Sequence, residues 1–178
     1  MYPDYKGVNV ASVKAMFEDL WGTELSDEPG LTVVETMDAV HDGSVTGMYV
    51  EGENPAMSDP DLHHARGALA KLQHLVVQDL YVTETAMYAD VVLPASAWPE
   101  KDGTASNTNR TVQMGRQAVN PPGDARQDWW IIQELANRMG LNWTYTHPKD
   151  VFAEMKQAMP SLNNLTWERL EREHSVTY

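Results

Sequence analysis

The chain has 178 residues, 42% of them hydrophobic, which is enough to bury a proper core within one domain. Its formal net charge of −13 argues against nucleic acid and against an anionic membrane surface as partners, because both bind clustered Lys and Arg side chains. The sequence has no cysteine, which excludes disulfides, zinc–thiolate sites and iron–sulfur ligation within this chain and fits a reducing compartment. No apolar run approaches the length of a membrane-spanning helix.

The first third of the chain is expected to form two helices, a strand and a third helix. The spacing of apolar residues predicts amphipathic helices at residues 10–20 and 32–40, and a short strand follows at residues 47–50. Ser58 and Asp59 precede Pro60, which is typical of a helix N-terminus. A helix is therefore expected from there to about residue 72.

The middle of the chain contains two short apolar strands, residues 75–77 and 91–93, separated by a helical turn that begins at residues 83–85. Residues 103–109 are rich in Gly, Ser and Asn and predict a loop or tight hairpin, with an extended segment at 110–114. Short strands that are apolar on both faces and alternate with helices indicate an α/β fold. We predict a doubly wound, mostly parallel Rossmann-like sheet with flanking helices.

The last third is expected to be helical. A breaker cluster at residues 119–123 precedes a predicted amphipathic helix at 124–139, which should end at Gly140. The apolar face of this helix would carry Trp129, Ile132, Leu135, Ala136 and Met139. Another helix is expected at residues 149–159, stopped by Pro160, and a mixed-charge surface helix begins at Trp167.

Polar residues follow each of the three predicted strands. Gly52 and Asn54 follow the first strand, Gln78 and Asp79 the second, and the loop after the third carries Lys101. Ligands bind at the carboxyl ends of the strands of a parallel sheet, so these residues are candidates for one site. Gly allows a ligand close to the backbone, Asn and Asp offer hydrogen-bonding groups, and Lys offers a charge for phosphate. Taken singly, each motif also fits an ordinary turn, a helix cap or a solvated loop.

Asp128 lies near the start of the long predicted helix. A carboxylate there suits the helix dipole, whereas a binding role requires it to face the donors of a ligand. The six histidines show no HExxH spacing, and no GxSxG nucleophile motif occurs. No catalytic residue and no metal ligand is therefore predicted within the chain.

Three segments together are far more specific than any single motif: GMYVEGENPAMSDPD at residues 47–61, LVVQDLYVTETAMYADVVLPASAWPEKDGTASNTNR at 75–110 and PPGDARQDWWIIQELANRMG at 121–140. In sequence, order and spacing they resemble the molybdopterin oxidoreductases. The most similar branch is the alpha, catalytic subunit of cytoplasmic NAD-dependent formate dehydrogenases. The resemblance is strong over residues 30–140. Asn109 and Thr111 depart from the charged pair that the family often carries there.

The resemblance implies that this region binds one guanine dinucleotide of a bis-molybdopterin guanine dinucleotide cofactor that carries molybdenum or tungsten. Asp79 or Asp128 is expected to accept hydrogen bonds from the ribose or the guanine, and Lys101 to supply the one useful cation. The expected domains are residues 1–140, which bind the cofactor, and residues 141–178, a helical extension. The full set of expected cofactor-binding residues is Gly52, Asn54, Gln78, Asp79, Thr85, Lys101 and Asp128.

The resemblance also implies a fragment of a larger subunit, because the family's iron–sulfur cysteines and its metal-ligating Cys or selenocysteine have no counterpart here. The full enzyme would oxidise formate to carbon dioxide in the cytoplasm and pass two electrons through iron–sulfur clusters toward NAD. Its expected partners are the remainder of the alpha subunit and diaphorase subunits that carry iron–sulfur clusters and flavin. The isolated chain is expected to be inactive.

Two other interpretations of the sequence stay open. The chain can be a stand-alone, non-catalytic α/β module that binds a nucleotide, or that binds a protein partner through its acidic surface and exposed Trp and Met residues. It can also be an ordinary NAD- or flavin-binding domain, although the glycine fingerprint G-x-G-x-x-G of such domains is missing after the first strand.

Overall fold

A computed structural model describes residues 1–178 and divides the chain into two compact units. Unit 1 combines three separated segments, residues 1–30, 102–118 and 142–178, and unit 2 combines residues 31–101 and 119–141. The two units differ from the predicted domains 1–140 and 141–178, which divide the chain at a single point. Segments 1–30 and 102–118 belong to the same unit as residues 142–178. The assignment of cofactor binding to residues 1–140 stays a prediction.

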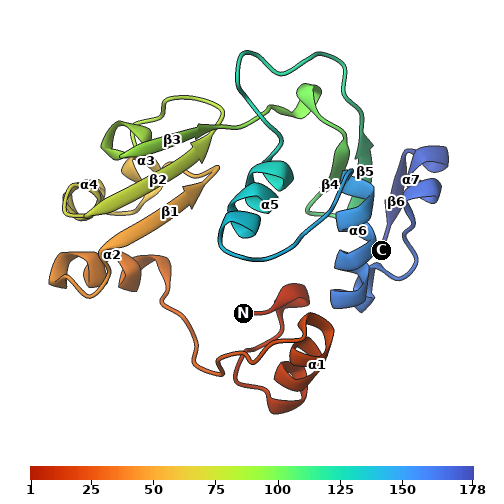
Figure 1. Cartoon of the computed structure of the whole chain (residues 1–178), viewed down its shortest axis with the longest axis horizontal. Coiled ribbons are helices and arrows are strands. Elements are labelled where there is room, and N and C mark those ends of the chain that lie inside the picture. Colours follow the sequence, from red (N-terminus) through yellow and green to blue (C-terminus); the bar gives the residue numbers. More distant parts are fainter. The chain divides into compact units, whose positions relative to one another are not determined.

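Unit 2 is built on a parallel sheet of three strands in the order β1-β2-β3: β1 (Gly47–Glu51), β2 (His74–Asp79) and β3 (Val91–Pro94) (Figure 1). Gly47 of β1 pairs with His74 of β2, and Val76 of β2 pairs with Val91 of β3. Its helices are α2 (Val33–Asp42), α3 (Pro55–Ser58), α4 (Leu62–Leu69), the 3-10 turns η2 (Ala86–Tyr88) and η3 (Trp98–Glu100), and α5 (Asp128–Arg138). The predicted α/β class, with a parallel sheet and flanking helices, is confirmed.

The core of unit 2 lies between the sheet and the helices that connect its strands. Val50, Leu75 and Val77 come from the strands, and Ala56 and Leu69 come from α3 and α4. A second cluster joins α2 to α4 through Met37, Val40 and Ala68. Because β2 is buried in the middle of the sheet, its last residues are fixed in position, and the polar side chains that follow it are held on a rigid edge.

Unit 1 contains an antiparallel sheet of three strands in the order β4-β5-β6: β4 (Gly103–Ser106), β5 (Thr111–Gly115) and β6 (Ser175–Thr177). Its helices are α1 (Ala11–Trp21), α6 (Pro148–Ala158) and α7 (Trp167–Glu173), with the 3-10 turns η1 (Pro3–Tyr5) and η4 (Pro160–Leu162). The largest core cluster of unit 1 is formed by Val112, Phe152, Leu162, Leu165, Trp167, Leu170 and Val176. The predicted hairpin is confirmed as β4 and β5, whereas β6 was not predicted.

The helix predicted to start at Ser58 and Pro60 is wrong in its boundaries. Residues 55–69 form two helices, because Pro55 begins α3 and Pro60 lies in the break between α3 and α4. The cap of α4 is Asp61, whose carboxylate accepts a hydrogen bond from the His64 backbone N–H at 3.0 Å.

The long predicted helix begins at Asp128 rather than at residue 124. Asp124 lies in a turn, and Arg126 forms a parallel bridge with Ala95 beyond the end of β3. The Arg126 N–H donates to the Pro94 carbonyl, and the Arg126 carbonyl accepts from the Ser96 N–H, so the helix cannot begin before this bridge. The apolar face was predicted correctly only at Ala136 and wrongly at three other positions. Ile131 and Ala136 are buried, whereas Ile132, Leu135 and Met139 are exposed. Gly140 follows the helix with φ +98°, as predicted for its C-terminus.

No helix in the structure is both long enough and apolar enough to cross a lipid bilayer.

Candidate functional site

A small cavity of about 170 Å³ lies at the carboxyl edge of the parallel sheet in unit 2. Five of the seven predicted site residues line it, and they come from four different places in the sequence. The lining residues are Gly52, Gln78, Asp79, Leu80, Ala95, Ser96, Trp98, Lys101 and Asp128. The topology explains this gathering, because β1, β2 and β3 are parallel and their carboxyl ends all reach the same edge.

Gln78 is the centre of the polar network at this edge. It is the last-but-one residue of β2 and is completely buried. Its Nε2 donates to Asp128 Oδ1 at 2.8 Å and to Glu51 Oε1 at 3.3 Å, and its Oε1 accepts a hydrogen bond from the Tyr49 hydroxyl. Gln78 therefore connects β1, β2 and α5 through one amide group, and both of its N–H donors are used.

Asp128 and Lys101 form an ion pair beside Gln78. Asp128 is the first residue of α5, and its second oxygen accepts from Lys101 Nζ. Lys101 Nζ also donates to the Ser96 carbonyl at 2.9 Å, so one of its three protons stays available. Both oxygens of Asp128 are occupied, and its charge is balanced by Lys101. The pair fixes the cavity wall more than it offers a free charge to a ligand.

Asp79 offers the free carboxylate oxygen of the cavity. Its Oδ1 accepts from the backbone N–H groups of Leu80 at 2.6 Å and Tyr81 at 3.2 Å, which fixes the orientation of the side chain. The second oxygen, Oδ2, has no partner within the chain. Gly52, which faces the same cavity, has φ +62° and open space where a Cβ would stand, so its backbone is exposed to whatever the cavity holds.

Asn54 and Thr85 lie outside this cavity and bind each other. Asn54 Oδ1 accepts from the Thr85 backbone N–H at 3.1 Å and from the Thr85 hydroxyl at 2.7 Å, and its Nδ2 donates to Glu84 at 2.8 Å. The Thr85 hydroxyl accepts from the Ala56 N–H at 3.0 Å. The two residues tie the loop after β1 to the turn after β2, and this arrangement supports the neighbouring edge.

Two groups of the polar network around Gln78, Glu51 and Tyr49, have raised pKa values. Burial raises the pKa of Glu51 above its ordinary value, and the negative charge of Asp128 raises it further, against the opposing effect of Lys101. Burial also raises the pKa of Tyr49, with added contributions from Glu51 and Asp128. The cavity is thus net acidic at its base, and it favours ligands that bring hydrogen-bond donors.

Sequence reasoning missed Ser96, Tyr49 and Glu51. Ser96 is completely buried, and its Oγ has no hydrogen-bond partner, although buried hydroxyls almost always have one. Its position two residues after Pro94 was a usable signal, since residues that follow a strand were the basis of the other candidates. Tyr49 and Glu51 lie inside β1, where the sequence indicated a strand and nothing else. No group of three or more His, Asp or Glu side chains forms a metal-ligand cluster.

Comparison with known proteins identifies the family. A family model described as molybdopterin oxidoreductase matches residues 2–138. The chain belongs to the molybdopterin oxidoreductase family. It is similar to the "F420-dependent formate dehydrogenase subunit alpha" of Methanocaldococcus jannaschii, with 44% identity over 173 residues, which are 96% of this chain and 25% of that protein. It is also similar to the "Putative formate dehydrogenase YrhE" of Bacillus subtilis (strain 168), with 44% identity over 169 residues, 95% of this chain and 17% of that protein.

Among solved structures, this member of the molybdopterin oxidoreductase family matches acetylene hydratase from Pelobacter acetylenicus with a TM-score of 0.69 and 21% sequence identity. The match covers 99% of this chain and 25% of that chain, and at this identity it shows a shared fold. The chain therefore spans a quarter or less of the length of the relatives that it matches.

Proposed function

We propose that the chain is the part of a formate dehydrogenase catalytic subunit that holds one guanine dinucleotide of a bis-molybdopterin guanine dinucleotide cofactor. The observation that carries the proposal is the gathering of Gly52, Gln78, Asp79, Lys101 and Asp128 around one cavity at the carboxyl edge of the sheet. The family membership and the formate dehydrogenase relatives support it.

The chemistry of the cavity suits the nucleoside end of such a cofactor. Guanine presents adjacent N–H donors and ribose presents two hydroxyl donors, and a carboxylate accepts such pairs well. Asp79 has a free oxygen for this purpose, whereas Asp128 is already occupied by Gln78 and Lys101. The Ser96 hydroxyl is buried without a hydrogen-bond partner, which costs free energy. A ligand group that forms a hydrogen bond with this hydroxyl would remove that free-energy cost.

The pyrophosphate needs a different set of partners. Lys101 retains one proton, and N–H groups of the loop that follows Gly52 complete the contact, because the acidic side chains of the cavity cannot hold phosphate oxygens. The Gly52 N–H itself is bonded to the Gln78 carbonyl at 2.9 Å. The metal of the bound cofactor supplies two-electron redox chemistry. The residues of this chain bind and orient its nucleotide end, and they take no part in removing the hydrogen of formate.

In this proposal the remaining functions lie in other parts of the enzyme. Formate is oxidised to carbon dioxide there, and the electrons pass through iron–sulfur clusters toward NAD, in contact with the remainder of the subunit and with flavin-containing diaphorase subunits. The complex works in the cytoplasm. The isolated chain has no activity, since it contains neither thiolate ligands nor a nucleophile motif.

Replacing Asp79 in the longer subunit tests the proposal. Asp79→Ala should reduce the molybdenum or tungsten content of the purified subunit and the guanosine monophosphate released from it by acid hydrolysis, and formate oxidation should fall in parallel. Asp124→Ala is the matched control, because Asp124 is an exposed carboxylate of the same unit that does not line this cavity. Full cofactor content in Asp79→Ala would remove Asp79 from the site.

The isolated chain provides a second test. Guanosine and GDP should bind with similar affinity and should protect the amides of residues 78–81 from hydrogen exchange, whereas adenosine should not. Protection by adenosine or NAD but not by guanosine would instead favour the ordinary nucleotide-binding module. Turnover of formate by the purified chain would contradict the fragment hypothesis.

A further inference from the structure

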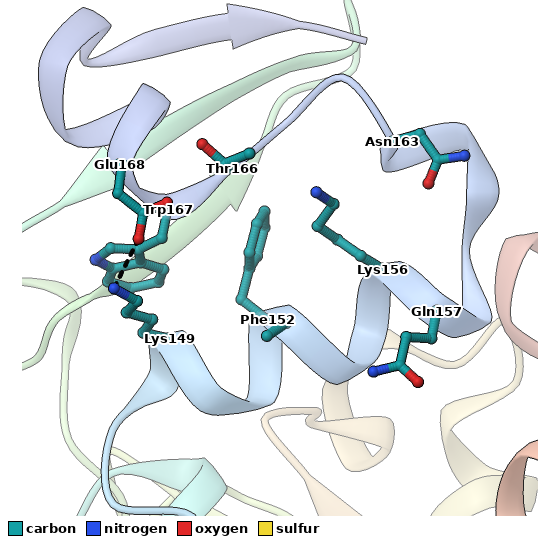
Figure 2. A pocket seen from close by; sticks show the side chains of 9 residues that line it. Lys149, Phe152, Lys156, Gln157, Asn163, Thr166, Trp167 and Glu168 are labelled. Atoms are coloured by element: carbon teal, nitrogen blue, oxygen red, sulfur yellow. Dashed lines mark ion pairs between the residues drawn. The ribbon is translucent and has the colours of Figure 1, made fainter.

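Unit 1 contains a second and larger cavity of its own. It has a volume of about 450 Å³ and is lined by α6, by the start of α7 and by the segment between η4 and α7. Figure 2 shows Phe152 and Lys156 projecting from α6 toward the segment that carries Thr166. Lys149, Phe152 and Lys156 are spaced by three and four residues, so they share one face of the helix.

The floor of this cavity is aromatic and fixed. Phe152 and Trp167 are 5% and 6% exposed, and their rings meet edge to face with centroids 6.0 Å apart. The Trp167 indole N–H donates to Glu171 Oε1 at 3.0 Å, so it is not available to a ligand. The small part of the two rings that reaches the cavity is therefore apolar, which favours an apolar body.

The charges at the rim are unequal. Lys149 Nζ lies 2.7 Å from Glu168 Oε1, and this ion pair raises the pKa of Lys149 and lowers that of Glu168. Lys156 is half-buried on the other side of Phe152 and has neither an ion pair nor a side-chain hydrogen bond. The cavity thus has one uncompensated positive charge, in a chain whose net charge is −13. Asn163 lines the end of the cavity next to Lys156.

We propose that this cavity binds a small monoanion that carries an aromatic or branched apolar body, with a carboxylate as the charged group. The body would lie on Phe152 and Trp167, and the carboxylate would pair with Lys156. Formate itself lacks the apolar body, so this is not a substrate site of the proposed enzyme. The inference is independent of the nucleotide site, because it uses residues of unit 1 alone.

Ligands of a different charge, a metal cation or a phosphate dianion, fit this cavity less well than a monoanion. A metal cation would meet Lys156 and only one carboxylate, which is already paired with Lys149. A phosphate dianion would need more than one positive charge, and the cavity offers one free ammonium beside the neutral amides of Gln157 and Asn163. The single charge and the aromatic floor therefore select a monoanion with an apolar part.

Fluorine NMR of fluorotryptophan-labelled chain tests the proposal directly. The chain has six Trp residues, and a Trp167→Phe variant assigns the resonance that belongs to the cavity. Naphthoate, added as the probe, should shift the Trp167 resonance and saturate below about 1 mM. Its neutral amide, naphthamide, should bind at least about fivefold more weakly, because it cannot form the ion pair with Lys156. That ion pair contributes about 1 kcal/mol. Formate should cause no shift.

Two variants with a matched control separate the ion pair from the apolar contact. Lys156→Met should weaken naphthoate binding about fivefold and leave naphthamide binding unchanged. Ala153→Leu should weaken the binding of both, because Ala153 is an exposed residue of α6 that lines the cavity and leucine would fill it. Lys71→Met changes the net charge equally but lies in unit 2, so it should leave binding unchanged.

The outcomes decide the matter. Saturable binding of naphthoate that depends on Lys156, both in this chain and in the longer subunit, supports the proposal. Absence of binding, or binding that Lys156→Met does not weaken, overturns it. Binding to the chain that is lost in the longer subunit also overturns it, since the remainder of the protein would then cover the cavity.

Discussion

Replacement of Gln78 by leucine tests whether the polar network, rather than the apolar core, fixes the carboxyl edge of the sheet. Leucine has about the same volume as glutamine and keeps the position filled, so no cavity arises. It removes the amide that joins Tyr49, Glu51 and Asp128. The expected result is a local loss of stability around β2 in unit 2.

The size of the loss follows from the three hydrogen bonds. The bond to the Asp128 carboxylate, at 2.8 Å, is charge-assisted and contributes about 2 kcal/mol. The Glu51 bond is longer, at 3.3 Å, and the Tyr49 bond is of the ordinary neutral kind, so each contributes about 0.5–1 kcal/mol. The apolar leucine side chain is stabilised by its complete burial, and this offsets roughly half of the free energy lost with the three hydrogen bonds. We expect a net destabilisation of about 2 kcal/mol.

Native-state hydrogen exchange at the Val77 amide measures this quantity for unit 2 alone. A loss of about 2 kcal/mol corresponds to about 30-fold faster exchange. Gln73→Leu is the control, because it makes the same chemical change at an exposed position in the same unit, and exchange at Val77 should stay within about twofold. If Gln78→Leu accelerates exchange no more than Gln73→Leu does, the network does not fix this edge.

Three further predictions concern the same edge. Thr85→Val should destabilise unit 2 by about 2 kcal/mol in urea denaturation, because it removes the buried hydroxyl between Asn54 and the Ala56 N–H; an effect below about 0.5 kcal/mol would contradict this. Glu51→Gln should stabilise the chain at neutral pH, since the raised pKa of Glu51 means that its ionised form disfavours folding, and thermal melts should show the gain disappearing as the pH falls below about 4. Gly52→Ala should cost about 1 kcal/mol through its φ of +62°, while Gly47→Ala, outside the left-handed region, should not.

The strand positions could be predicted from sequence because each strand is a short run of β-branched and apolar residues with a clear boundary. β1, β2 and β3 lie within two residues of the predicted segments. The order of strands and helices then determined that their carboxyl ends share one edge, and this is why five of the seven proposed residues line one cavity. The nature of each contact could not be predicted, because it depends on side-chain geometry across elements that are distant in sequence.

Asp128 illustrates that limit. From sequence, Asp79 and Asp128 were equivalent candidates, and only the structure separates them: Asp128 is occupied by Gln78 and Lys101, while Asp79 keeps a free oxygen. The start of α5 at Asp128 also depends on a tertiary contact, the bridge between Arg126 and Ala95. Helix propensity depends on the local sequence and therefore does not predict this contact. β6 was missed for the same reason, since three residues form a strand only because β5 offers an edge.

The acidity of the chain bears directly on how a dinucleotide would be held. A net charge of −13 repels phosphate, and the cavity is lined by Asp79 and Asp128 against the single cation of Lys101. In the proposed function, affinity therefore comes mainly from the nucleoside, through donors on guanine and ribose, and the phosphates add little beyond their contact with Lys101 and backbone N–H groups. This is the physical reason to expect guanosine to bind about as well as GDP, in contrast to sites built on Lys and Arg. A cofactor anchored by its base rather than its charge is also held in a defined orientation, because the directions of its hydrogen bonds, unlike a phosphate charge, distinguish one end of the molecule from the other.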